Sequence, residues 1–199
     1  MNNIILAGII HIDKENTFSS YGERFCRCSM ECKRTSGIND VLNVVIPEIK
    51  AGNIECGSKI KIIGEIRTRN VIKGEKGLLD VFVFANEILE YEKEDENFVR
   101  GNGFVCKKPT FRETPSGRNI SDLILCTHRE RTNKSDYIPT IVWGRNAIRA
   151  QQLEVGCEVC FRGRLQSREY IKRHDDGSEE TKTAYELSVC TFEEGANED

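Results

Sequence analysis

Short segments in which apolar and polar residues alternate dominate the sequence, and this two-residue period predicts β-strands. The clearest is 25–32, Phe-Cys-Arg-Cys-Ser-Met-Glu-Cys, in which Cys26, Cys28, Met30 and Cys32 share one face. Helical spacing occurs only in 145–153, which is long enough for about two turns. Further β-branched or aromatic runs between turn residues predict strands at 59–64, 79–84, 122–126 and 158–162.

The same phrases occur twice along the chain. The segment 57–69, Gly-x6-Gly-Glu-Ile-Arg-Thr-Arg, returns 99 residues later at 156–168 as Gly-x6-Gly-Arg-Leu-Gln-Ser-Arg, and Thr-Phe followed by Gly at 17–22 returns at 110–117. A repeat of about a hundred residues indicates two copies of one domain. Three strands, a short helix and two more strands per copy are the chain order of the OB-fold, a five-stranded Greek-key barrel. We therefore expect an all-β protein with two tandem OB-fold barrels, each with at most a short helix.

An acidic segment separates the two copies. Residues 87–97 are rich in Glu and Asp and have little apolar period after Tyr91, which is typical of a linker. We expect a first barrel at 1–91, a linker at 92–97, a second barrel at 98–194 and a short acidic tail at 195–199.

Charge is unevenly distributed along the 199 residues. The chain has 29 Lys and Arg against 32 Asp and Glu, a formal net charge of -3. Residues 100–173, however, hold 15 basic and 7 acidic side chains, a net +8, and residues 174–199 hold 1 basic and 9 acidic, a net -8. A basic block inside a folded domain predicts a surface that binds an anion. The alternative is a solvated basic surface without a ligand.

The cysteine count and the lack of long apolar runs indicate in which cellular compartment the protein acts. Nine cysteines are an odd number, and the N-terminus has neither a basic start nor a small-residue cleavage site, so we expect an unexported protein of the reducing cytoplasm. No run approaches the roughly 20 apolar residues of a membrane span, so we expect no membrane contact. The thiols of 26–32 favour core packing over zinc, because zinc sites usually take short Cys or Cys and His pairs from turns. We expect no metal and no cofactor; a thiol-based metal or redox protein is the weakest alternative.

Aromatic residues stand among arginines in the second copy. Tyr137 and Trp143 share one run, and Tyr170 follows the Arg-rich segment 162–168. Single-stranded nucleic acid needs this combination, because bases stack on aromatic rings and phosphates need cations. DNA and RNA both fit the pattern. The alternative is that the rings fill the barrel core, because alternation in 137–143 does not say which face is solvent-exposed.

Four motifs follow one another in the second copy. They are Pro-Thr-Phe-Arg-Glu-Thr-Pro-Ser-Gly-Arg at 109–118, Ile-Pro-Thr-Ile-Val-Trp-Gly at 138–144, Gly-Arg-Leu-Gln-Ser-Arg-Glu-Tyr at 163–170 and Tyr-Glu-Leu-Ser-Val at 185–189. Together they resemble the bacterial single-stranded DNA-binding protein family, over nearly all of residues 98–194. The first half looks like a diverged copy, which matches mainly through Gly8, Gly57 and the segment 64–69.

The resemblance implies stacking positions at Tyr137, Trp143 and Tyr170. In the first copy the last of these positions holds Val71, and 42–47 has no aromatic residue. We therefore expect the second barrel to bind more strongly, with the first contributing cations or serving mainly in assembly. The cations that we expect at the nucleic acid are Arg112, Arg118, Arg129, Arg131, Arg145, Arg162, Arg164 and Arg168 in the second copy, and Lys59, Lys61, Arg67 and Arg69 in the first.

These observations predict a protein that binds and protects single-stranded DNA with little sequence preference, in DNA replication, recombination or repair. We expect no enzyme, because the sequence has no Gly-x4-Gly-Lys-Ser/Thr, Gly-x-Ser-x-Gly or His-Glu-x-x-His motif. The family implies four OB-folds, which a homodimer supplies, in a bacterial or phage-encoded, nucleoid-associated protein of the cytoplasm. Its acidic tail with an apolar tip, which docks replication and repair proteins, is not matched at 193–199. The alternative function is an OB-fold protein-interaction or assembly module, such as a primosome-like accessory factor.

Overall fold

Strands make up most of the molecule. The computed structural model describes residues 1–74, 76–129, 132–174 and 177–195. In these ranges the elements are β1 (Asn2–Ser20), β2 (Glu23–Lys33), β3 (Asn39–Pro47), α1 (Glu48–Ala51), β4 (Lys59–Lys73), β5 (Lys76–Glu90), β6 (Glu96–Val105), β7 (Thr110–Glu113), β8 (Asn119–His128), β9 (Ser135–Trp143), α2 (Arg145–Ala150), β10 (Glu158–Arg173) and β11 (Glu179–Glu194).

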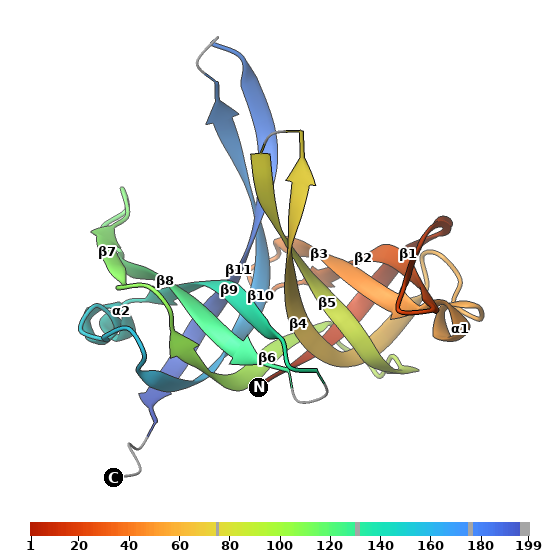
Figure 1. Ribbon diagram of the computed structural model, residues 1–199, viewed down its shortest axis with the longest axis horizontal. Coiled ribbons are helices and arrows are strands. Elements are labelled where there is room, and N and C mark those ends of the chain that lie inside the picture. Colours follow the sequence, from red (N-terminus) through yellow and green to blue (C-terminus); the bar gives the residue numbers. More distant parts are fainter. Residues whose placement is uncertain (75, 130–131, 175–176, 196–199) are drawn as a thin grey trace.

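The strands form two closed circuits of five, which lie next to each other in Figure 1. In the first circuit β1 pairs with β2 and β4, β2 pairs with β3, and β5 pairs with β4 and, in parallel, with β3. The second circuit repeats this pattern with β6, β8, β9, β10 and β11, and β7 adds a short strand at the edge of β8. Each helix follows the third strand of its circuit. The expected all-β OB-fold is confirmed.

Alternation along the strands places every second side chain in a barrel interior. In β2 the side chains of Cys26, Met30 and Cys32 are buried, so the expected packing of this face in the core is confirmed. Burial raises the pKa of the Cys28 and Cys32 thiols to about 12, which keeps both thiols protonated. These residues therefore act as small apolar side chains of the first barrel.

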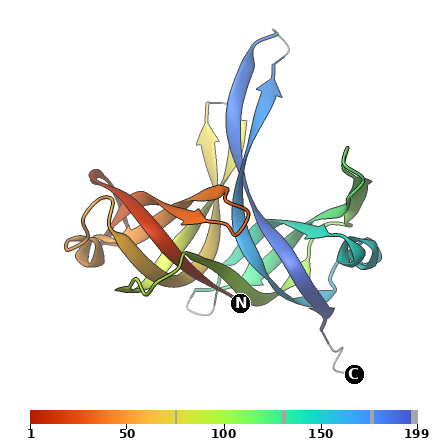
Figure 2. The same cartoon turned by 180° about the vertical axis from the view of Figure 1, so that it is seen from behind.

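Two hairpins extend well beyond the barrels. The patterns at 59–64 and 79–84 predict only the parts of β4 and β5 that lie in the barrel wall, whereas the two strands run to 73 and from 76. The outer part is not predicted because side chains such as Ile72 are exposed there, and their pattern has no core-facing period. The hairpins β4–β5 and β10–β11 project in the same direction from the middle of the molecule (Figures 1 and 2).

The helical spacing at 145–153 predicts a slightly longer helix than the structure contains. Helix α2 ends at Ala150, and the N–H of Leu153 donates to the Ala150 carbonyl (3.1 Å) in a turn that follows it. The apolar residue that suggests a longer helix, Leu153, is buried in the core after this turn.

Strands β1 and β6 join the two circuits as antiparallel neighbours. Next to this pairing the Asn2 carboxamide bonds the N–H (2.6 Å) and the carbonyl (3.1 Å) of Ile66, and the Asn97 carboxamide bonds the same groups of Leu165 (3.0 and 2.6 Å). Because Asn2 and Asn97 hold corresponding places in their halves, the two halves are related by an approximate two-fold axis at the junction.

A buried aspartate crosses the junction from the second half to the first. Asp136, at 1% exposure, accepts hydrogen bonds from the Arg129 guanidinium (2.5 and 2.7 Å) and from the backbone N–H of Thr68 in β4 (2.5 Å). Arg129 also donates to the Thr68 carbonyl (3.3 Å). The hydrogen bond to Asp136 raises the pKa of Arg129. The two side chains together link the two halves.

An equivalent contact crosses the junction from the first half to the second. Asp40, fully buried, accepts hydrogen bonds from Arg34 (2.5 and 2.8 Å) and from the backbone N–H of Ser167 in β10 (2.8 Å). Arg34 donates to the Ser167 carbonyl (3.2 Å), as Arg129 does to Thr68. We call these two contacts, Arg129 with Asp136 and Arg34 with Asp40, the junction clamps.

Candidate nucleic-acid interface

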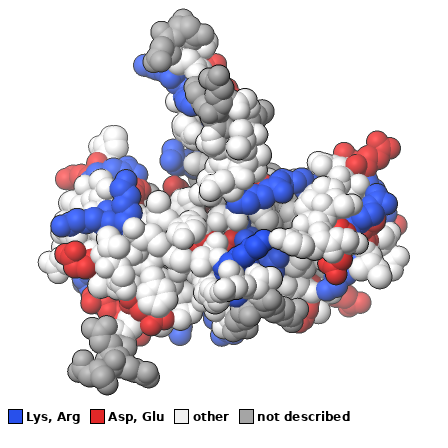
Figure 3. All heavy atoms as spheres, in the orientation of Figure 1, with Lys and Arg blue, Asp and Glu red and all other residues white. Residues whose placement is uncertain are grey.

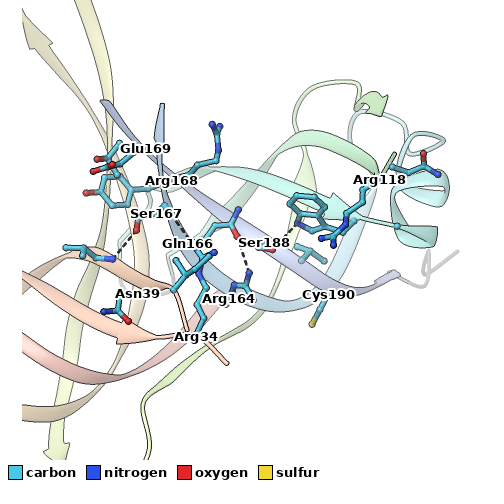
Figure 4. A pocket seen from close by; sticks show the side chains of 18 of the residues that line it. Arg34, Asn39, Arg118, Arg164, Gln166, Ser167, Arg168, Glu169, Ser188 and Cys190 are labelled. Carbon is cyan, nitrogen blue, oxygen red and sulfur yellow. Dashed lines mark hydrogen bonds between the residues drawn. The ribbon is translucent and has the colours of Figure 1, made fainter. Parts of the chain in front are cut away.

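A groove of about 1450 Å³ runs along the second barrel where that barrel meets the first half. The second barrel contributes β10, β11, the start of α2 and the turn between β7 and β8, and the first half contributes the turn between β2 and β3, which lies next to β10 in Figure 2. Figure 4 shows Arg34 on one side of the groove, Arg118 on the other, and Arg164, Gln166 and Ser188 between them. The groove is thus built from both halves of the chain.

Trp143, the last residue of β9, lines this groove. Its indole Nε1–H donates to the Ser188 hydroxyl (3.1 Å). Along β9 the side chains of Ile138, Thr140 and Val142 are buried in the core, so Trp143 lies on the outer face of the strand. Alternation alone does not say whether this ring fills the barrel core or faces solvent. In the structure the ring is partly exposed and lies in the groove.

Arginines of the second barrel surround this ring. Because they alternate along β10, Arg164 and Arg168 project from the same face of that strand. Arg164 donates weakly to Gln166 (3.4 Å), and its Nε is the one buried side-chain nitrogen or oxygen in the described ranges that has no partner. A buried guanidinium N–H without an acceptor favours an anion beside it. The predicted cations that line the groove are Arg118, Arg145, Arg164 and Arg168.

Comparison with known proteins identifies the second half of the chain. The model of the single-strand binding protein family matches residues 99–193. Residues 99–193 therefore belong to this family. Proteins of the single-strand binding family bind single-stranded DNA and are not enzymes, which confirms the predicted function class.

Two solved structures share the fold over the whole chain. The wild-type single-stranded DNA binding protein from Thermus aquaticus aligns with a TM-score of 0.76 at 18% identity, over 100% of this chain and 95% of that chain. A deletion and point mutant of the same protein gives a TM-score of 0.78 at 18% identity, over 100% of this chain and 96% of that chain. At this identity the likeness concerns the fold. A search of curated proteins found no match.

The stacking positions that the single-strand binding family implies do not all lie in the groove. Tyr137, 50% exposed, is at the other end of β9 from Trp143, and its backbone N–H donates to the Thr68 hydroxyl of the first half (2.9 Å). Six residues of strand span about 20 Å, which separates the two rings. Tyr170 is on the β10–β11 hairpin, and the Cζ of Arg168 lies 5.8 Å from its ring centroid. Neither tyrosine lines the groove.

The remaining predicted cations of the second half lie elsewhere. Arg112 pairs with Asp122 on the β7–β8 hairpin (2.5 Å), and Arg129 is held in a junction clamp. Arg162 lies on the outer face of the sheet, away from the groove. Arg131 lies outside the described residues.

Of the predicted cations of the first half, two lie near the segment that joins the circuits. The Lys59 ammonium is 4.8 Å from the Tyr91 ring centroid, and Lys61 forms an ion pair with Glu96 (3.0 Å). Hydrogen bonding to Glu96 raises the pKa of Lys61. These two lysines are therefore engaged within the protein and separate from the groove.

Arg67 and Arg69 belong to a second cationic surface, on the outside of the first barrel. Figure 3 shows basic side chains at the foot of the hairpins, on the face where β4 and β5 lie in front in Figure 1. The sequence interpretation misses the aromatic part of this surface, although alternation in 79–84 places Phe82 and Phe84 on one face. The pattern alone does not say that this face is the outer one. We call it the aromatic surface; its members are Phe18, Phe25, Arg27, Arg67, Arg69, Phe82 and Phe84.

The described ranges contain no group of three His, Cys, Asp or Glu side chains placed to hold a metal ion. Their helices are all too short to cross a membrane. All nine cysteines are free thiols.

Proposed function

We propose that single-stranded DNA lies in the groove of the second barrel, with a base stacked on Trp143 and phosphates bound by Arg118, Arg145 and Arg164. The observation that carries this proposal is the pairing of a fixed aromatic ring with a buried arginine N–H that lacks an acceptor. A nucleotide supplies both missing partners, a base face for the ring and a phosphate oxygen for the arginine.

The proposed contacts read no base edges. Stacking on Trp143 contributes about 1–3 kcal/mol per base and is available to every base, and arginine binds the phosphate of any nucleotide. Binding therefore has little sequence preference. A strand held in this way has its bases covered, which protects it from nucleases and from pairing during replication, recombination or repair.

Titration of the intrinsic fluorescence tests this placement, because Trp143 is the only tryptophan. Oligo-dT should quench the signal to saturation, and the logarithm of the affinity should fall with the logarithm of salt concentration by about 0.7 per phosphate neutralised. Arg164→Ala should weaken binding at least several-fold. The matched control is Arg173→Ala, since Arg173 pairs with Glu179 on the exposed hairpin (2.9 Å). Equal affinities for the two variants would rule out the placement, and the same titration with oligo-rU measures any DNA preference.

We also propose a homodimer, which brings four OB-folds together. The outer face of the sheet carries an apolar row in which Ile63 of β4, Ile5 of β1 and Phe98 of β6 are direct cross-strand neighbours. Phe98 is 37% exposed. An apolar row across the middle of an outer sheet face is typical of a self-association surface.

Charges on the two sides of this row support a symmetric pairing. On one side Arg100 and Arg162 face each other across β6 and β10, and neither forms an ion pair within the described ranges. On the other side Glu87 of β5 is the cross-strand neighbour of Ile63. A two-fold axis through the row sets the basic side of one copy against the acidic side of the other.

The mass in solution tests the assembly. A chain of 22.7 kDa predicts a dimer of about 45 kDa by light scattering. Phe98→Glu should give the monomer, whereas Ile171→Glu, which changes an exposed apolar residue on the hairpin, should leave the dimer intact. A monomeric parent protein at micromolar concentration would contradict the proposal.

The domain limits and the compartment complete the proposal. We propose 1–91 and 98–194 as the two OB-fold units and 92–97 as their connection, the last two residues of which already lie in β6. The nine free thiols favour a reducing cytoplasm as the place of action.

A further inference from the structure

Arg34 of the first half and Arg164 of the second half line the same groove (Figure 4). Arg34 donates to the Ser167 carbonyl (3.2 Å), and Arg164 donates to the side chain of Gln166 (3.4 Å). Because Gln166 and Ser167 are consecutive residues of β10, both guanidinium groups are held along the same short stretch of that strand. Two cations at neighbouring points of one groove repel each other unless an anion lies between them.

Neither guanidinium group has its full set of acceptors. The Nε and one Nη of Arg34 donate to Asp40, and the same Nη donates to Ser167, so the other Nη has no partner within the described ranges. The buried Nε of Arg164 has no acceptor either. In the described part of the chain, Asp40 is the only acid that pairs with Arg34, and Arg164 forms no ion pair. Unused donors on two adjoining arginines favour an anionic ligand.

The twin clamp shows how the first barrel fills the corresponding place. Arg129 is the counterpart of Arg34, and the repeat places Glu65 where the second barrel has Arg164. The hydrogen bond to Asp136 raises the pKa of Arg129, and the nearby charge of Glu65 raises it further. The approximate two-fold axis therefore relates an acid near Arg129 to a second arginine near Arg34. The charge at this one position is reversed between the barrels.

The fold does not require two arginines at this place. Both barrels close with the same strand pairing, and both clamps are formed, whether the neighbouring strand carries an acid or a base at this position. Like charges without a counter-ion lower the stability of the folded state. The pair of arginines therefore needs an explanation other than folding.

The segment that carries Arg34 adds an apolar wall to the groove. Ile38 and Val41 line the groove, with 58% and 45% of their surfaces exposed. The N–H of Val41 donates to the Ser167 hydroxyl (3.0 Å), which holds this segment against β10. A nucleotide combines an anionic phosphate with the flat faces of a base, so it matches a cation that has apolar neighbours.

We infer that Arg34 of the first half and Arg164 of the second half bind one DNA phosphate between them. The inference rests on the proposed function, which assigns Arg164 but no residue of the first half to the strand. The first half then contributes a cation that the sequence interpretation does not single out. It does so through a junction clamp and not through the face of its own barrel.

Matched substitutions in the two clamps separate binding from stability. Arg34→Gln and Arg129→Gln each leave one buried aspartate without its counter-ion, so both should lower the urea midpoint by similar amounts. Oligo-dT of about 12 nucleotides, within the site of one OB-fold, reports on the groove through quenching of Trp143. Arg34→Gln should weaken this binding about tenfold, because a charged hydrogen bond is lost. Arg129 does not line the groove, so Arg129→Gln should bind like the parent protein.

Circular dichroism checks that both clamp variants keep their strands. Any loss of affinity that comes only from a looser junction affects the two variants alike, so the difference between them measures the contact of Arg34 with the strand. Equal affinities of the two folded variants overturn the inference.

A double-mutant cycle tests whether the two arginines share a phosphate. The loss of affinity from Arg34→Gln with Arg164→Ala should be smaller than the product of the two separate losses, because either change already disrupts the same contact. The reference cycle combines Arg34→Gln with Arg118→Ala on the other side of the groove, and its losses should multiply. Losses that multiply in both cycles contradict a shared phosphate.

A further variant leaves both clamps intact. The N–H of Arg34 donates to the Ile38 carbonyl (2.8 Å), so Ile38→Glu places a carboxylate in the groove close to Arg34, where it competes with phosphate. This variant should bind the short oligo-dT several-fold more weakly. Ile49→Glu is the matched control, because Ile49 of α1 is 91% exposed and does not line the groove. Equal affinities of these two variants contradict the inference, even if the clamp variants do not fold.

The inference and the proposed function fail differently. If Arg164→Ala weakens binding while Arg34→Gln matches Arg129→Gln, the strand lies in the groove and the contact with the first half is wrong. If Trp143 is not quenched in the parent protein and anisotropy shows no complex, the proposed function itself is wrong.

Discussion

Removing one buried charge from a junction clamp measures how strongly the two halves are held together. Asp136 accepts hydrogen bonds of 2.5, 2.5 and 2.7 Å from Arg129 and Thr68 and is 1% exposed. Asp136→Asn keeps the shape but leaves the Arg129 guanidinium, whose side chain is 17% exposed, without a counter-ion. Breaking a buried ion pair by removing one partner costs about 3–5 kcal/mol. Because the guanidinium retains some solvent contact, we expect a loss of about 3 kcal/mol in the free energy of unfolding.

Equilibrium unfolding in urea provides the measurement, with the midpoint falling and the slope unchanged. The twin clamp supplies an internal replicate: Asp40→Asn should cost a similar amount, because Asp40 makes the same contacts with Arg34 and Ser167. Asp122→Asn is the control, since this carboxylate is 41% exposed in an ion pair and should contribute less than about 1 kcal/mol. The reasoning fails if Asp136→Asn costs no more than the control.

Three further outcomes follow from local geometry. Gly163→Ala should destabilise the second barrel by more than about 2 kcal/mol in the same urea assay, because its Cβ would lie 2.2 Å from the Ser188 carbonyl oxygen. Ser188→Ala should weaken oligo-dT binding a few-fold by anisotropy, because Trp143 loses the hydroxyl that fixes its indole. Thiol titration should find Cys28 and Cys32 unreactive at pH 8, while exposed cysteines react. The raised pKa of Cys28 and Cys32 contributes stability that is complete below about pH 9 and is lost as the pH rises towards 12.

The sequence alone predicts the features that depend on residues close together in the chain. Alternation in 25–32 is enough to place Cys26 and Met30 in a core, and the repeated segments are enough to indicate two similar units. The residues that line the groove cannot be predicted from neighbouring positions in the chain, because Arg34 of the first half lines a groove of the second barrel. Family spacing groups Tyr137 with Trp143, but strand geometry sets them at opposite ends of β9. The groove takes residues from both halves, and only the three-dimensional fold brings these together.

The approximate two-fold axis relates the two junction clamps to each other, but the outer surfaces of the two barrels differ. The junction clamps repeat residue type and contact in both halves, whereas the surfaces do not, since Phe84 in one barrel corresponds to Ser188 in the other. The groove is nevertheless completed by the opposite half, through Arg34. In the proposed placement, a strand bound in the groove contacts both halves and stabilises the arrangement in which the clamps are closed. The proposed binding unit is therefore the joined pair of barrels, and the shape of the groove depends on the junction as much as on the barrel that carries it.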